Sequence, residues 1–363
     1  MSFDDNDFPY KVSFQRILWK MGFWSRIEIP VLAYSIDDYT KSLKRHDLTD
    51  VDVYGELINS DFATYKYIAD CKSGRNVKAT ERAYWLKGVM EFTGATKGFL
   101  IKKKISSNTR LFLDKLSIYA IDEKNLSELE KIYYVSNNND LFSVDYYKKR
   151  YQIIDELKDE YAKIYSYLSG RYWYNPLHSN LRILLNMLQK NNFYQQFNQE
   201  SSTSHKFIIL EIAICLSRIV LDCCNYVLHR NISDIPSCVL EYSFGGIAGY
   251  NNKRNMFNEI KALLETEMPN EEMNKLLIMQ SDFIDGLIKL VANFITESHH
   301  SKESIKYLEL MQHEIILDKE LNFQDLIGPT FSSVGLKLAK DVLRYYIGYA
   351  NINESIILNC LKK

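Results

Sequence analysis

The sequence predicts an α/β domain at the N-terminus, with a mixed sheet flanked by helices, and an all-α domain after it. Up to about residue 138, short apolar strands alternate with amphipathic helical stretches. From residue 141 onward, long stretches have helical periodicity and little strand signal. Residues 137–140, NNND, are loop-forming and separate the two patterns. We therefore expect two domains, residues 1–138 and residues 139–363.

The composition fits a two-domain protein with a large core. The chain has 363 residues, of which 46% are hydrophobic. The formal net charge of −1 argues against a general polyanion binder, although a local basic patch remains compatible with it. The first 150 residues carry a small excess of basic over acidic side chains, which suits phosphate contact in the N-terminal domain.

Cysteine usage and hydropathy indicate the cellular setting. The six cysteines stand mostly in apolar runs and form no CxxC pair, so we expect buried, reduced thiols. The chain has no basic-then-apolar N-terminal segment and no run of 18 apolar residues. These patterns predict a cytoplasmic protein without membrane contact.

The N-terminal domain begins with a helix and three strands. Apolar residues at helical spacing, followed by Gly22, predict a helix over residues 8–22. Arg26–Tyr34 has strand character, and the polar stretch Ser35–Leu48 is expected to be a loop or short helix. Two further strands, about Val51–Ile58 and Tyr65–Cys71, are joined by a short polar turn and form a predicted hairpin.

The rest of the N-terminal domain alternates helices and strands. A basic connection follows the hairpin, and an amphipathic helix begins at Ala79. The expected elements are the helix Ala79–Phe92, the strand Lys97–Lys103, the helix Asn108–Leu116, the strand Ser117–Ile121 and a helix over Asp122–Ile132.

The second domain is expected to consist of helices alone. Breaks at Gly, Pro and Asn clusters divide it into helical stretches. Three histidines, His299, His300 and His313, stand near predicted helix ends, where we expect them to be solvated. The predicted helices cover about residues 143–168, 179–191, 206–230, 254–267, 271–297, 301–316 and 334–349.

Charged residues gather at one end of the predicted hairpin. Side chains alternate along a strand, so Asp70 and Lys72 share a face. The neighbouring strand carries Asp52, with Asp50 two residues before it. Like charges held together raise each other's pKa or need a cation between them. Such a cluster is costly unless the protein uses it.

The order of elements around these residues resembles the PD-(D/E)XK nuclease superfamily, which has the restriction-endonuclease-like fold. Archaeal Holliday-junction resolvases and methyl-directed type IV restriction enzymes belong to it. Asp52 matches the first acid of the motif, and Asp70-Cys71-Lys72 matches the (D/E)-x-K tripeptide. The resemblance covers roughly residues 8–135, with Ala79–Phe92 as the helix that crosses to the next strand.

The chain departs from that pattern at two points. The more usual tripeptide has Glu where this chain has Asp70. Many members also have a Glu in the opening helix, where this chain offers Gln15. The nearest acids are Asp7 before that helix and Glu28 after it. These differences leave open whether one metal ion or two are bound.

The resemblance implies a metal-dependent nuclease that hydrolyses DNA phosphodiester bonds. Mg²⁺ or Mn²⁺ would be held by Asp52, Asp70 and the Cys71 backbone carbonyl, with the Cys71 side chain directed into the core. Lys72 would hold or deprotonate the attacking water. Asp52, Asp70 and Lys72 are thus the expected catalytic residues, and Asp50 is expected just outside the site.

Three basic residues near the tripeptide are candidates for DNA contact. Arg75, Lys78 and Arg82 stand where they could reach backbone phosphates near the scissile bond. The alternative is that they are surface charge without a nucleic-acid partner. Both interpretations are compatible with the sequence.

Two other functions remain open. The fold could serve as a non-catalytic binding or assembly module, which the near-neutral charge and the missing helix-borne acid favour. It could also be an RNA-directed nuclease. In the DNA nuclease hypothesis, the helical domain serves substrate selection, binding of a protein partner or self-association. Restriction, repair and antiviral defence are the processes that the resemblance suggests, with defence preferred.

Overall fold

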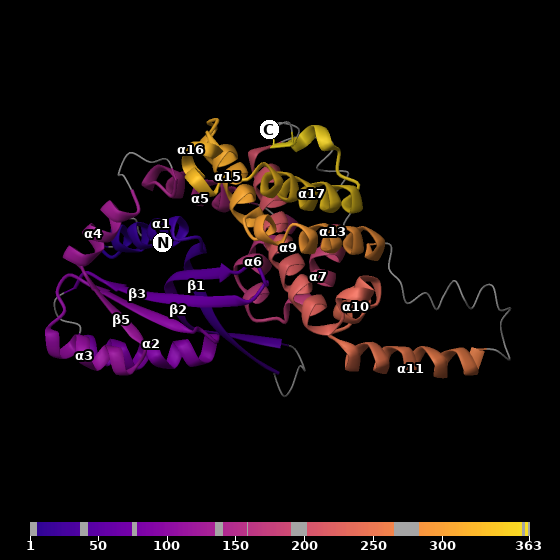
Figure 1. The fold of residues 1–363 in the computed structure, drawn as a ribbon, viewed down its shortest axis with the longest axis horizontal. Helices are drawn as coiled ribbons and strands as arrows, with labels where there is room; N and C mark the ends of the chain where they lie inside the picture. The colour runs from indigo at the N-terminus through magenta and orange to yellow at the C-terminus, as the bar shows by residue number, and fades with distance from the viewer. Residues whose placement is uncertain are drawn as a thin grey trace.

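A five-stranded sheet and a helical region lie side by side in the computed structural model of the chain (Figure 1). The fold confirms the sheet with flanking helices at the N-terminus and the helical C-terminal region. The structure describes residues 6–36, 43–74, 78–134, 141–157, 159–189, 202–264, 283–357 and 360–361.

The sheet is mixed, and its strands follow one another in chain order. The first three strands pair antiparallel, while the last two run parallel to the third. Parallel neighbours need a crossover, which helices supply here. The strands are β1 (Trp24–Ile36), β2 (Leu43–Ile58), β3 (Thr64–Lys72), β4 (Lys97–Lys102) and β5 (Ile118–Asp122), with α2 (Ala79–Thr93) and α3 (Ser107–Lys115) as crossovers.

Helices cover both faces of the sheet (Figure 1). On one face, α1 (Phe8–Lys20) and α4 (Glu123–Ile132) pack through a cluster that includes Phe14, Val53 and Cys71. On the other face, α2 and α3 pack through a cluster that includes Leu86 and Leu100. The result is a three-layer arrangement in which each side of the sheet is buried. The Cys71 side chain is fully buried, as predicted.

The prediction of a loop or short helix over Ser35–Leu48 was wrong for its described part. β1 extends to Ile36 and β2 begins at Leu43, while residues 37–42 lie outside the described residues. The two strands pair as a ribbon, with Tyr34 opposite Arg45. Many side chains of this ribbon face solvent, so its sequence lacks the apolar alternation that marks a half-buried strand.

The helical region is built around α9 (Thr203–Arg230), which is buried on nearly all sides. A helix that is apolar all round belongs inside a protein. The predicted helix 143–168 is two helices, α5 and α6, separated near Leu157. The other helices are α5 (Val144–Glu156), α6 (Asp159–Ser169), α7 (Leu177–Gln189), α10 (Ile235–Ser243), α11 (Ile247–Leu264), α13 (Ile284–Thr296), α14 (Ser298–Ser301), α15 (Ser304–Leu317), α16 (Phe323–Ile327) and α17 (Ser333–Ala350).

One hydrophobic core joins the two predicted domains. The largest buried cluster contains Trp19 and Trp24 from the N-terminal region together with Phe142 and Tyr146 from the helical region. The Arg218 guanidinium of α9 also forms a buried ion pair with Glu56 of β2. The change from strands to helices therefore falls within a continuous core, while residues 135–140, where the boundary was predicted, lie outside the described residues.

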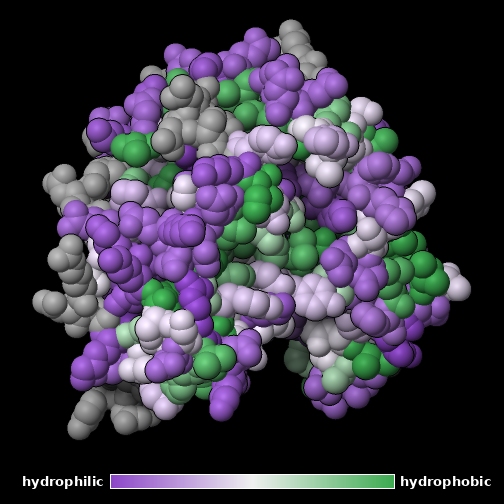
Figure 2. Space-filling model, turned by 60° about the vertical axis from the view of Figure 1, so that its left-hand side comes forward, coloured by the Kyte–Doolittle hydropathy of each residue, from purple (hydrophilic) through white to green (hydrophobic). Residues whose placement is uncertain are grey.

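The outer surface on the side seen in Figure 2 is mainly hydrophilic. Hydrophobic side chains gather near the middle of that view, and the surface is indented at its lower edge. All six cysteines are free and buried, which confirms the predicted thiols. Among the described helices, none combines the length and the apolar character that crossing a bilayer requires.

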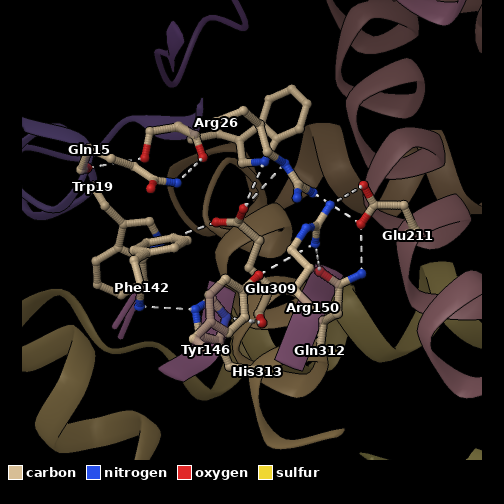
Figure 3. Close-up of polar contacts among 12 residues, drawn as sticks. Gln15, Trp19, Arg26, Phe142, Tyr146, Arg150, Glu211, Glu309, Gln312 and His313 are labelled. Carbon is tan, nitrogen blue, oxygen red and sulfur yellow. Dashed lines mark hydrogen bonds and ion pairs between the residues drawn. The ribbon is translucent and has the colours of Figure 1, made fainter. Parts of the chain in front are cut away.

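A buried polar network connects β1 to the helices (Figure 3). Arg26 of β1 lies 3.4 Å from Glu211 of α9 and 3.7 Å from Glu309 of α15. Glu211 also forms an ion pair of 3.2 Å with Arg150 of α5 and accepts a 2.6 Å hydrogen bond from Gln312. The two arginines lower the pKa of Glu211 to about 2, although its burial acts in the opposite direction. The network therefore keeps a charged carboxylate inside the core.

His313 corrects the expectation that this histidine is solvated. The side chain is fully buried and stacks on Tyr146, with ring centroids 3.9 Å apart. Its Nδ1 lies 2.8 Å from the Glu309 carbonyl oxygen, and its Nε2 accepts a hydrogen bond from the Phe142 N–H. Burial lowers the pKa of His313 to about 3, so the ring is neutral. The histidine is thus a core residue of α15.

Glu309 should make stability depend on pH. Burial raises its pKa to about 7, although Arg26 and the indole N–H groups of Trp19 and Trp24 act against the shift. An unfolded glutamate titrates near pH ~4.3. The folded state therefore binds the Glu309 proton more tightly than the unfolded state does. This proton contributes to the free energy of unfolding below the unfolded pKa, and the contribution is lost as pH rises through about 7.

The expected size of this loss is on the order of 3 kcal/mol. Glu309→Gln should remove this pH-dependent loss, because glutamine does not titrate. Between pH 5 and 7.5, the unfolding free energy of the variant should therefore fall less than that of the native protein. Urea denaturation at several pH values measures both. Parallel pH profiles for the two proteins would contradict the assignment.

Candidate active site

Asp52 lies where β2 and β3 stop pairing. The ladder runs from Ile58 opposite Thr64 to Val53 opposite Ala69. Just beyond it, Oδ2 of Asp52 accepts a 2.8 Å hydrogen bond from the Cys71 N–H. The carboxylate thus takes the place of a main-chain acceptor at the end of the ladder. Its side chain is 6% exposed, so the sheet holds it in one position.

The ladder between β1 and β2 is interrupted beside Asp52, with the same register on both sides of the interruption. Ile27 pairs with Val53 and Ile29 with Val51, which leaves Glu28 without a partner in the ladder. Glu28 has a φ of 56°, in the left-handed region that non-glycine residues rarely adopt. The Glu28 carboxylate lies in the same group of charged residues, with Oε1 3.0 Å from Nζ of Lys11.

Lys72 connects the two predicted acids. Its Nζ lies 3.3 Å from Oδ2 of Asp52 and 3.8 Å from Oδ1 of Asp70. The lysine side chain is 25% exposed, while that of Asp70 is fully buried. The structure therefore brings the three predicted catalytic side chains together at the end of β3, with the lysine side chain partly exposed.

Arg82, in the first turn of α2, binds Asp70 with two nitrogens. Its Nε donates a 2.8 Å hydrogen bond to Oδ2, and Nη2 donates to Oδ1. The guanidinium also stacks on Trp85, with 3.9 Å between its carbon and the ring centroid. Burial raises the pKa of Asp70, although Arg82 opposes the shift. Arg82 thus supplies a fixed positive charge beside a buried carboxyl group.

Lys11 of α1 is a site residue that sequence reasoning missed. Its Nζ lies 2.9 Å from Oδ1 of Asp52 and 3.0 Å from Oε1 of Glu28. Burial would lower the pKa of Lys11, but these two carboxylates raise it above its ordinary value. A buried lysine near the start of a helix is disfavoured by the helix dipole. The burial of Lys11 and its acidic partners follow from the packing of α1, so the sequence alone does not show them.

Asp7 adds a third carboxylate around Lys72. It occupies the N-cap position of α1 without a side-chain capping bond, and its carboxylate lies 3.5 Å from the lysine Nζ. Its Oδ1 also accepts a 2.5 Å hydrogen bond from the Ser73 N–H. Burial acts to raise the pKa of Asp7, but the bonds to Ser73 and Lys72 lower it. The acid noted before the opening helix therefore lies at the site.

The charge on Lys72 bears on its chemical role. Burial lowers its pKa, but Asp52, Asp70 and Asp7 together raise it above the ordinary value for lysine. A lysine surrounded by these three carboxylates is protonated when no cation is bound to them. A protonated lysine suits the role of holding a water or phosphate oxygen, and deprotonation of the water by Lys72 stays a prediction.

The other predicted residues lie around this cluster or away from it. Lys78 is exposed and pairs with Glu81 at 3.2 Å, and Arg75 lies outside the described residues. Asp50 is exposed on β2. Gln15 is buried and bonds Ser25 and Tyr147, so it belongs to the core. Contact of Arg75, Lys78 and Arg82 with DNA stays a prediction.

The donor set can be compared with the needs of Mg²⁺ or Mn²⁺. Hard cations prefer oxygen ligands, and two carboxylates from adjacent strands meet that need, with the Cys71 backbone carbonyl as the predicted third donor. Within the described ranges, no three His, Cys, Asp or Glu side chains form a metal-binding group. Arg82 and Lys11 now contact the carboxylate oxygens, and Arg82 is 23% exposed. The oxygen donors suit a divalent cation, and binding one would require Lys11 and Arg82 to give up these contacts.

Comparison with known proteins gives no assignment for the chain. No family model matches it, and no significant match is found among curated proteins or solved structures.

Proposed function

We propose that the protein is a metal-dependent nuclease that hydrolyses DNA phosphodiester bonds through an N-terminal domain of the PD-(D/E)XK type. The observation that carries the proposal is the convergence of Asp52, Asp70 and Lys72. Three side chains spread over 21 positions meet where the pairing of β2 with β3 ends, with the Lys72 ammonium 3.3 Å from one acid and 3.8 Å from the other.

Each residue then has a role that follows from its position. Asp52 and Asp70, with the Cys71 carbonyl, would hold Mg²⁺ or Mn²⁺, which activates water and relieves charge on the phosphoryl group when bound. Lys72 is protonated and partly exposed, so it can bind a phosphate oxygen and stabilise the charge that develops there. Arg82, which pairs with Asp70 here, would release that carboxylate and bind a backbone phosphate of the DNA.

One observation favours a non-catalytic binding module instead. Lys11 and Arg82 already form ion pairs with the two acids, as a structural salt-bridge cluster would. In that case the acids would hold α1 and α2 onto the sheet and would not bind a divalent cation. An RNA-directed nuclease would use the same site, and a panel of DNA and RNA substrates separates it from a DNA nuclease.

A Mn²⁺ titration followed by thermal melting separates a metal site from a structural cluster. At a metal concentration 100-fold above Kd, binding stabilises the folded state by about 2.7 kcal/mol. We expect the native protein to gain melting temperature and Asp52→Asn to lose this gain. Asp122→Asn is the matched control, because Asp122 also ends a strand and pairs with an arginine, Arg110. A native protein that Mn²⁺ does not stabilise would favour the binding module.

A further inference from the structure

A cavity of about 270 Å³ lies between the sheet and the helical region. β1 forms one side, and α5, α6 and α9 contribute the others. Its inner wall includes the buried network of Arg26, Arg150 and Glu211 (Figure 3). Other lining residues, among them Tyr151 and Ser169, are partly exposed. The cavity therefore has a buried floor and a rim that solvent reaches.

Aromatic rings dominate the lining. Trp24 and Trp173 stack on each other, with centroids 5.4 Å apart and planes 14° from parallel. Aromatic faces and edges bind flat rings well, and each polar tip can hold a hydrogen bond. The seven aromatic lining residues are Trp24, Phe142, Tyr146, Tyr147, Tyr151, Tyr165 and Trp173.

The charged groups of the lining are already paired. Arg26 and Arg150 both contact Glu211, and Glu28 contacts Lys11. An anionic ligand would have to take an arginine from Glu211 and leave that carboxylate buried without its partner, which is costly. A cationic ligand would meet two arginines. The balance of charge favours an uncharged occupant.

We propose that this cavity binds an uncharged heteroaromatic molecule of nucleobase or nucleoside size. Flat rings match the aromatic lining, and ring nitrogens and amino groups match the hydroxyl groups of the lining tyrosines, whereas the side chains of Gln15 and Ser169 are already hydrogen-bonded. Ligand pockets are commonly apolar, lie at domain interfaces and hold a few polar groups that fix orientation. Their usual volume starts near ~300 Å³, so this cavity suits a small ligand.

The cavity is linked to the candidate active site through one residue. Glu28 lines the cavity and holds Lys11, whose Nζ lies 2.9 Å from Asp52. A ligand that draws Glu28 away would loosen Lys11 and change the charge around Asp52. This consequence rests on the proposed nuclease function, whereas binding in the cavity does not.

Isothermal titration of the full-length protein tests the proposal without metal or DNA. The probes are adenosine, guanosine, cytidine and uridine, each compared with its 5′-monophosphate. We expect at least one nucleoside to bind, and to bind more tightly than its monophosphate by about tenfold. No binding by any nucleoside, or tighter binding of the monophosphate, would overturn the proposal. Neither result depends on whether the protein cleaves DNA.

Two variants of α6 locate the binding. Ser169 lines the cavity, so Ser169→Phe should fill it and weaken nucleoside binding by at least about tenfold. Ser166 is exposed on the same helix and does not line the cavity, so Ser166→Phe should bind like the native protein. Equal binding by both variants would refute the location. If Ser169→Phe fails to fold, Tyr151→Leu, which removes a partly exposed lining ring, must show the same loss.

Discussion

Asp70→Asn is expected to abolish DNA cleavage while the protein stays folded. The substitution keeps the size of the side chain and can still accept a hydrogen bond from Arg82, but it removes the negative charge that a divalent cation needs. Loss of one group that stabilises charge at a reaction centre commonly costs about 10³-fold in rate. A gel assay of plasmid nicking with Mn²⁺ measures the rate.

The melting temperature of Asp70→Asn shows whether a loss of cleavage comes from the removed charge or from unfolding. Burial raises the pKa of Asp70 above that of an unfolded aspartate. Ionisation of Asp70 therefore lowers the stability of the fold as pH rises above the unfolded pKa. Asparagine does not ionise, so it avoids this loss of stability. The Asp70→Asn variant should therefore have a melting temperature equal to or above that of the native protein at neutral pH. Asp122→Asn, at the end of β5, is the control and should keep cleavage. Native-like cleavage by Asp70→Asn would contradict a metal-binding role.

Glu211→Leu is expected to cause the largest loss of stability. The substitution leaves Arg26 and Arg150, both buried, without the carboxylate that lies 3.4 Å and 3.2 Å from them. Removing one partner of a buried ion pair costs about 3–5 kcal/mol, because the remaining charge is uncompensated. The urea concentration at the unfolding midpoint should fall by this loss divided by the slope of the unfolding free energy against urea. The slope itself should be unchanged.

An exposed ion pair provides the matched control for this experiment. Glu91 on α2 pairs with Lys87 at 2.8 Å, but its side chain is 73% exposed. Exposed pairs of this kind contribute little to stability. Glu91→Leu should therefore leave the midpoint unchanged. Equal midpoints for Glu211→Leu and Glu91→Leu would show that the buried network does not hold the sheet to the helices.

The sequence predicted the hairpin and its charged end because both depend on local rules. Alternation along a strand places Asp70 and Lys72 on one face, and strand pairing brings Asp52 beside them. The alternating helices and strands that follow predicted a mixed sheet flanked by helices, while the order of its strands comes from the structure. These features depend on residues close in the chain, so the pattern of apolar residues is enough to show them.

The remaining site residues depend on contacts that no local pattern shows. Lys11 reaches Asp52 only because α1 packs against the end of the sheet, 41 positions away in the chain. Arg82 meets Asp70 because α2 begins just beyond β3. Both were visible as basic residues, but their partners follow from the tertiary arrangement.

The sequence analysis missed the ribbon of β1 and β2 and the helix α10, for different physical reasons. The ribbon of β1 and β2 is exposed, so it has no apolar face to reveal it. α10 begins with Pro236 in its first turn, where proline suits a helix start, and the proline was taken as a break. His313 was expected in solvent because the burial of α15 on several sides follows from packing.

Cleavage by the purified protein tests the central claim most directly. Supercoiled, linear, branched and single-stranded DNA are incubated with Mn²⁺ or with EDTA, using the native protein and Lys72→Ala. The nuclease assignment predicts that the native protein cuts at least one substrate, only with Mn²⁺, and that Lys72→Ala cuts none. Failure of the native protein to cut any substrate, or equal cutting by Lys72→Ala, would contradict it.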